Sequence, residues 1–74
     1  MRRPAKKLRE LLGVNVRRLR QEKNLTQEEL CARAGMGQSY LSQLESGAKS
    51  VSIDVLDKLA RALNVSPDQL LRKQ

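Results

Sequence analysis

LTQEELCARAGMGQSYLSQLES, residues 25–46, carries the clearest helical pattern in the sequence. Apolar side chains recur within it at helical spacings, at Leu30, Ala34, Leu41 and Leu44. The pattern breaks at Gly35, and glycine readily adopts the left-handed backbone conformation that ends a helix. The stretch therefore predicts two short helices joined by a tight turn, which is a helix-turn-helix motif.

The flanking sequence also predicts helices. Thr26 with Glu29, and Ser66 with Gln69, have the spacing of capping boxes at helix starts. We expect helices over residues 4–23, 26–34, 38–45 and 52–63, and a last short helix that begins at Ser66. No strand pattern is present. The predicted fold class is all-α, with a compact five-helix domain over residues 5–74 and a basic arm over residues 1–4.

The first helix has an apolar stripe that predicts its buried face, at Leu8, Leu12, Val16 and Leu19. Gly13 interrupts this helix at an expected cost of about 1 kcal/mol relative to alanine. It is interpreted as a weak point that divides an appended N-terminal turn from the helix proper. Asn24 and Asn64 are suited to end the first and fourth helices in the left-handed conformation.

The positive charge is concentrated at one end of the chain. Residues 1–23 hold nine Lys or Arg and two Glu, whereas residues 24–74 hold six basic and six acidic residues, so the first segment accounts for the whole net charge of +7. A basic block of this kind is typical of a protein that binds a polyanion. It is equally compatible with a solvated, solubilising face.

Composition excludes several classes of protein. No run of about 18 apolar residues predicts a membrane span. The chain has no histidine and a single cysteine, Cys31, so we expect no catalytic site, no metal site, no cofactor and no disulfide. A cytoplasmic protein fits this cysteine usage. Because two helices of the motif must approach closely at Cys31, packing is favoured over redox sensing there.

The motif resembles the DNA-binding domain of the lambda-repressor/Cro (XRE) family over about residues 11–71. The residues that carry the resemblance are QEEL (27–30), Gly35, QSYLSQLE (38–45) and Gly47. The resemblance implies a lambda-repressor-like fold whose second and third helices form the helix-turn-helix. Two positions differ from the family pattern: Cys31 replaces a usual Ala, and Gly37 replaces a usual Ser or Thr cap.

The recognition helix is expected at about residues 38–45, because the second helix of such a motif enters the DNA major groove. With its leucines facing the core, four uncharged side chains point outward and are the candidates for base reading: Gln38, Ser39, Ser42 and Gln43. Amides and hydroxyls are suited to hydrogen-bond base edges. Outside this motif, the same residues would be ordinary polar surface.

Further residues are candidates for phosphate contact or for positioning: Arg17, Arg18, Thr26, Gln27, Tyr40, Ser46 and Lys49. By resemblance, Gln27 approaches a phosphate and braces Gln38, although a tolerated first-turn residue is the alternative. Tyr40, the only aromatic residue, either packs on the core or offers its hydroxyl to a phosphate. The resemblance also implies a structural ion pair between Arg20 and Glu45, with direct contact of Arg20 to a phosphate as the alternative.

The resulting hypothesis is a sequence-specific transcriptional regulator that binds double-stranded DNA as a homodimer on a palindromic operator. One expected dimer surface includes Val65, Leu70 and Leu71, which are alternatively part of the small core. Two other hypotheses stay open: an antitoxin-type module that binds a partner protein, and a basic N-terminal segment that lies on a membrane surface.

Overall fold

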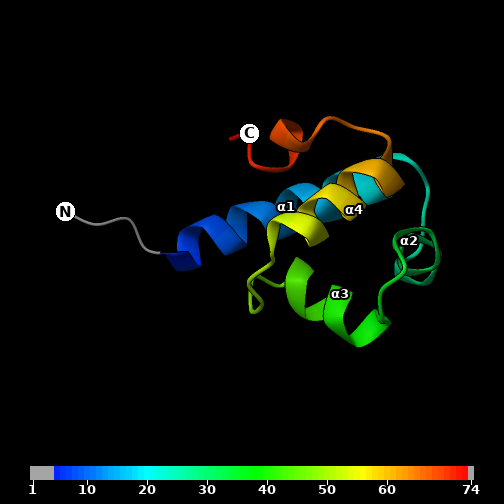
Figure 1. The fold of residues 1–74 in the computed structure, drawn as a ribbon, viewed down its shortest axis with the longest axis horizontal. Coiled ribbons are helices and arrows are strands. Elements are labelled where there is room, and N and C mark those ends of the chain that lie inside the picture. The colour runs from blue at the N-terminus through cyan, green and yellow to red at the C-terminus, as the bar shows by residue number, and fades with distance from the viewer. Residues whose placement is uncertain (1–4, 74) are drawn as a thin grey trace.

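The computed structural model describes residues 5–73, and within them the chain forms four α-helices and one 3₁₀ turn. The elements are α1 (Ala5–Glu22), α2 (Gln27–Ala34), α3 (Gln38–Glu45), α4 (Ile53–Leu63) and the 3₁₀ turn η1 (Pro67–Leu70). Figure 1 shows the helices gathered around one centre: α3 packs against α1, α2 packs against α4 and α3, and η1 packs between α1 and α4. The expected basic arm, residues 1–4, lies outside the described residues.

The helix ends follow the local sequence. The Thr26 hydroxyl accepts a hydrogen bond from the Glu29 amide (3.0 Å), and Glu29 accepts one from the Thr26 amide (2.8 Å), so the capping box is confirmed. Gly35 ends α2 with φ +70°, and Asn24 and Asn64 end α1 and α4 in the same left-handed region. The interactions that define these ends span only a few residues, which is why the sequence predicts them well.

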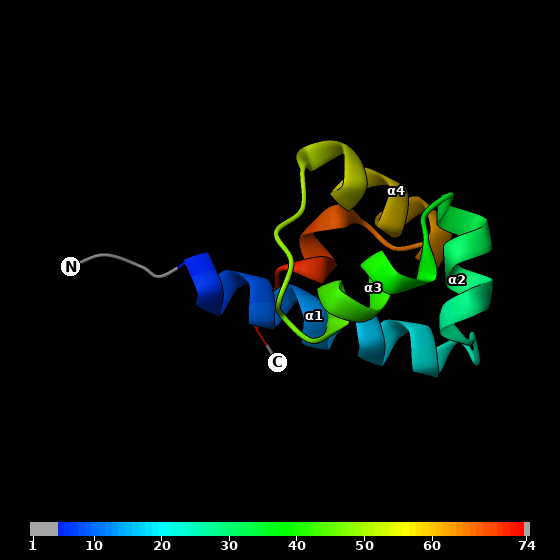
Figure 2. The ribbon, with the colours of Figure 1, turned by 90° about the horizontal axis from the view of Figure 1, so that it is seen from below.

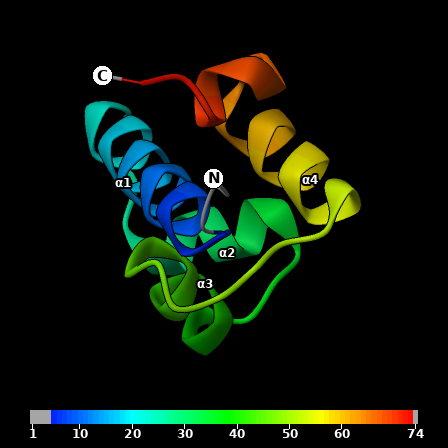
Figure 3. The same cartoon turned by 90° about the vertical axis from the view of Figure 1, so that its left-hand side faces the viewer.

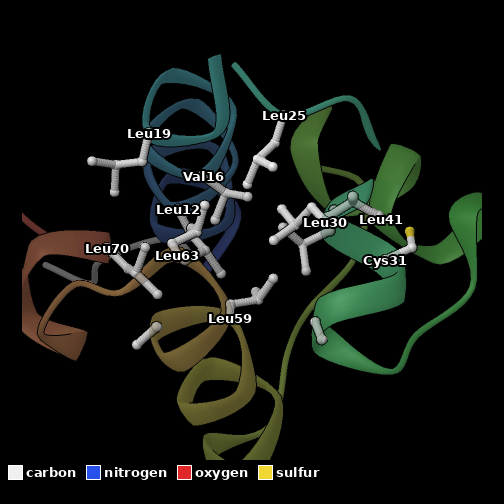
Figure 4. Packing of buried hydrophobic residues seen from close by; sticks show 13 residues of the cluster. Leu12, Val16, Leu19, Leu25, Leu30, Cys31, Leu41, Leu59, Leu63 and Leu70 are labelled. Atoms are coloured by element: carbon white, nitrogen blue, oxygen red, sulfur yellow. The ribbon is translucent and has the colours of Figure 1, made fainter. Parts of the chain in front are cut away.

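One hydrophobic core joins all the elements. Figure 4 shows its side chains converging between α1, α2, α4 and the C-terminal turn. Its buried members are Leu12, Val16, Leu19, Leu25, Leu30, Cys31, Ala34, Leu41, Leu44, Leu59, Ala60, Leu63 and Leu70. Because Leu41 and Leu44 point into this core, the opposite side of α3 faces solvent.

Two expectations about the ends of the chain are wrong. Leu8 is 50% exposed, so the buried stripe of α1 begins only at Leu12. The fifth helix is a single 3₁₀ turn, so the fold has four α-helices rather than five. Buried Asn15 donates through Nδ2 to the carbonyls of Leu70 (2.8 Å) and Arg72 (2.9 Å). Because these two carbonyls accept hydrogen bonds from Asn15 on α1, they are not paired with amides of a further helical turn. This favours an end to the 3₁₀ turn over its continuation as an α-helix.

Gly13 is not a break between two segments, because α1 is one continuous helix. The glycine lies where α1 crosses the C-terminal end of α3. A Cβ atom at this position would lie 2.6 Å from the carbonyl oxygens of both Leu44 and Glu45. Glycine is therefore required here by the close approach of two helix backbones, and it sets the separation between α1 and α3.

We predict that Gly13→Ala destabilises the protein by about 1–3 kcal/mol, although alanine is the better helix former. The clash is with backbone carbonyls, so the end of α3 must move as a unit to relieve it. Chemical denaturation measures the effect, with Val14→Ala, at an exposed neighbour, as the control. A Gly13→Ala variant that is more stable than the parent would show that helix propensity dominates and that the crossing tolerates a methyl group.

Candidate nucleic-acid interface

The exposed side of α3 carries no charged side chain. Its four outward residues are those expected to read bases: Gln38, Ser39, Ser42 and Gln43. Within residues 5–73, none of these four side chains makes a hydrogen bond. Figure 2 views the molecule from the side on which α3 lies in front of the other helices. The face is therefore open, and its amides and hydroxyls are free to bind a ligand.

A buried ion pair fixes the C-terminal end of α3 to α1. The guanidinium of Arg20 donates through Nε (2.7 Å) and Nη2 (3.1 Å) to the two carboxylate oxygens of Glu45. Arg20 also donates through Nη1 to the carbonyl oxygen of Leu25 (2.8 Å). The side chains of Arg20 and Glu45 are 11% and 4% exposed. The pair named from family resemblance thus forms in a bidentate, largely desolvated geometry.

Gln27 contacts α3 at a different residue than expected. Its amide nitrogen donates to Glu45 Oε1 (3.0 Å), so the expected contact with Gln38 is replaced by one at the opposite end of α3. Glu45 consequently links the start of α2, the end of α3 and the last turn of α1. The sequence did not predict that Gln27 joins Arg20 and Glu45. Nothing in the local pattern shows that the buried carboxylate of Glu45 accepts a further hydrogen bond from α2.

The loop after α3 brings together three of the remaining candidates. Tyr40 is partly buried against the core, and its hydroxyl donates to the carbonyl of Ser50 (3.3 Å). Lys49 Nζ lies 5.9 Å from the centre of the Tyr40 ring, within cation–π range. Ser46 donates through its hydroxyl to the carbonyl of Gln43 (2.8 Å). Lys49 is the cation that this loop presents beside the open face of α3.

The remaining phosphate candidates lie on α1 and at the start of α2. Arg18 forms an exposed ion pair with Glu22 (3.0 Å) one helical turn away, whereas Arg17 is exposed and has no ion pair within residues 5–73. The Thr26 side chain caps α2, so it positions that helix start. A helix N-terminus with free amide groups favours an anion such as a phosphate.

Cys31 packs in the core between α2 and its neighbours. Burial raises the pKa of its thiol, and the carboxylates of Glu45 and Glu28 raise it further. A thiol in this state is unreactive, which agrees with a packing role. In residues 5–73, no helix is long and apolar enough to cross a membrane, and no cluster of His, Cys, Asp or Glu is suited to hold a metal ion.

This fold and open face define a DNA-binding domain of the helix-turn-helix class. The family model described as helix-turn-helix, HTH_3, matches residues 16–70, and the chain belongs to this family of transcriptional regulators. An uncharacterized HTH-type transcriptional regulator, y4dJ of Sinorhizobium fredii, is 50% identical over 64 residues, covering 86% of this chain and 83% of its own.

Control proteins are also similar to this chain. The control protein C.BamHI of Bacillus amyloliquefaciens is 38% identical over 65 residues, which are 86% of this chain and 80% of C.BamHI. The crystal structure of the restriction-modification controller protein C.AhdI from Aeromonas hydrophila superposes with a TM-score of 0.82 at 37% identity, covering 84% of this chain and 94% of that protein. The antitoxin PezA of Streptococcus pneumoniae is 36% identical over 56 residues, which are 35% of its length.

Proposed function

We propose that the protein is a sequence-specific transcriptional regulator that reads double-stranded DNA through α3. The observation that carries the proposal is the open face of Gln38, Ser39, Ser42 and Gln43 on a helix whose other side is fixed in the core. Glutamine can bond adenine N6 and N7 bidentately, and serine can donate or accept. The α3 face is uncharged although the chain has a net charge of +7. The side chains that would contact bases are therefore different from the basic side chains that would contact phosphates.

Phosphate contacts beside the face would set its register. The candidates for them are Thr26 and Gln27 at the start of α2, and Ser46 and Lys49 in the loop after α3; Gln27 binds Glu45, which directly precedes Ser46. We assign Tyr40 to hold that loop through Ser50 rather than to reach DNA. Arg20 and Glu45 act structurally, because their ion pair satisfies both charged groups inside the protein.

We propose further that the protein acts as a homodimer on a palindromic operator. An eight-residue recognition helix covers only a few base pairs. A two-fold pair places two such helices about 34 Å apart on successive major grooves, which doubles the sequence that is read.

The proposed function is tested by selection of bound fragments from random duplex DNA, followed by titration against salt. We expect the selected fragments to share a two-fold-symmetric sequence. We also expect the logarithm of the affinity to fall linearly with the logarithm of salt concentration, because each phosphate contact releases counterions. Selection that enriches no sequence would contradict specific reading.

An antitoxin-type module is the second candidate, and the similarity to PezA favours it. This candidate predicts that a partner protein is bound tightly whether or not the α3 face is intact. The regulator model is preferred, because the similarity to y4dJ and C.BamHI extends over at least 80% of each of those proteins, against 35% of PezA.

A further inference from the structure

The carboxylate of Glu45, the last residue of α3, is shared between two other helices. Both of its oxygens accept hydrogen bonds from the guanidinium of Arg20 on α1 (2.7 and 3.1 Å). Its Oε1 also accepts one from Nε2 of Gln27, the first residue of α2 (3.0 Å). Figure 3 shows α2 directly above α3, the helix against which it packs. The ion pair accounts for Arg20, whereas the contact with Gln27 needs a separate explanation.

The contact with Glu45 determines which way the Gln27 amide is turned. An amide has an oxygen, which only accepts hydrogen bonds, and a nitrogen, which carries two hydrogens. The oxygen would repel a carboxylate, so the nitrogen must face Glu45. Turning the amide by half a rotation would place two acceptors against each other at a buried site, which is unfavourable. Glu45 therefore selects one of the two orientations of this side chain.

One hydrogen of the Gln27 nitrogen has no partner within residues 5–73. The two N–H bonds of a planar amide point in different directions, so the second is not aimed at Glu45. Gln27 is partly exposed, whereas Glu45 is buried. The bonded hydrogen thus faces the interior, and the second is the one that remains for a group outside the protein.

The surroundings of this hydrogen suit an anion. Gln27 begins α2, where the amide groups of the first turn and the helix dipole both favour negative charge. Thr26 occupies the amide of Glu29, which leaves the earlier first-turn amides for a ligand. The carboxylate of Glu29 binds the Thr26 amide, and Glu28 is exposed, so its charge is solvated. A phosphate oxygen at this helix start can accept the second N–H of Gln27.

We propose that Glu45 is a positioning residue for Gln27: by accepting one amide hydrogen, it holds the other toward a DNA phosphate at the start of α2. The inference rests on the DNA binding of the proposed function and deepens it. Glu45 also ends the helix that carries the candidates for base reading. One carboxylate therefore fixes the reading helix and a neighbouring phosphate contact relative to each other.

The two side-chain amide protons of Gln27 test the proposal by NMR spectroscopy. In the free protein, the proton bonded to Glu45 should exchange with solvent more slowly than the other. On addition of duplex DNA, the second proton should shift, and the bonded proton should stay protected. Gln27→Met, which is similar in length and has no donor, assigns the two signals by removing them. Gln69 on η1 is the internal control, because its amide is held through its oxygen by Ser66 and η1 packs on α1 and α4.

Two NMR results would overturn the proposal. If neither proton of Gln27 shifts with a duplex that binds, this side chain does not contact DNA. If the bonded proton loses its protection in the complex, Glu45 releases the amide when DNA binds and does not position it.

Titration of Gln27→Met distinguishes a phosphate contact from a purely structural role. We expect the affinities for selected and random duplex to fall by the same factor, about tenfold, because a phosphate contact carries no sequence information. The salt dependence should not change, since a neutral amide releases no counterion, whereas Lys49→Met should reduce the logarithmic slope by about 0.9. The Arg20–Glu45 pair remains in Gln27→Met, so thermal denaturation should show a folded protein. A loss confined to the selected duplex would contradict the phosphate contact.

This inference and the proposed function fail separately. A chain that selects no sequence, but shows the expected response of Gln27 to random duplex, contradicts only the base reading. A chain that selects a sequence without any response at Gln27 contradicts only the role assigned here to Glu45. A chain that binds no duplex contradicts both.

Discussion

Glu45→Ala is expected to lower the free energy of unfolding by about 3–5 kcal/mol and to abolish DNA binding as a result. Removing the carboxylate leaves the guanidinium of Arg20 buried, with only the carbonyl of Leu25 as a hydrogen-bond acceptor. It also removes the acceptor of Gln27. For a chain of 74 residues, total stability is about 4–11 kcal/mol, so the loss is a large part of it.

Thermal and chemical denaturation measure this effect. Glu22→Ala is the matched control, because it removes the carboxylate of the exposed ion pair with Arg18. Such an exposed pair contributes about 0.3–0.5 kcal/mol, so the control should melt almost normally. Near-normal melting of Glu45→Ala, together with normal DNA affinity, would refute the structural role of the pair.

The double variant Gln38→Ala/Gln43→Ala is expected to lose its preference for the selected sequence while keeping its affinity for random duplex DNA. Each bidentate contact with a base contributes about 1–3 kcal/mol of discrimination, so two contacts correspond to a loss of at least about 30-fold. Both side chains are exposed, so the fold should not change. Competitive titration of selected against random duplex measures the ratio.

Gln21→Ala, which alters an exposed glutamine on α1, controls for the loss of an amide elsewhere on the surface. An unchanged preference in the double variant would remove the basis for assigning α3 as the reading helix. A drop in affinity for both kinds of DNA would instead assign the two glutamines to phosphate contact, since phosphate contacts carry no sequence information.

The four α-helices and their ends could be predicted from the sequence, because their determinants are local. The capping box of Thr26 and Glu29 and the left-handed positions Gly35 and Asn64 each act within a few residues of the helix end that they define. The recognition helix, Gln38–Glu45, has the expected bounds. Its outward residues followed from the leucine spacing alone, since one face of a helix must be buried. Which of them contact DNA stays a prediction.

The residue pattern alone therefore specified an all-α helix-turn-helix with an uncharged outer face and a basic N-terminal end. The packing of the helices assigned four further roles: Gly13 is the crossing point with α3, Asn15 holds the C-terminal turn, Gln27 binds Glu45, and Leu8 lines a surface groove. All four roles have the same cause. These roles depend on which helix lies opposite the residue, and the spacing of residues along one helix does not specify its neighbour.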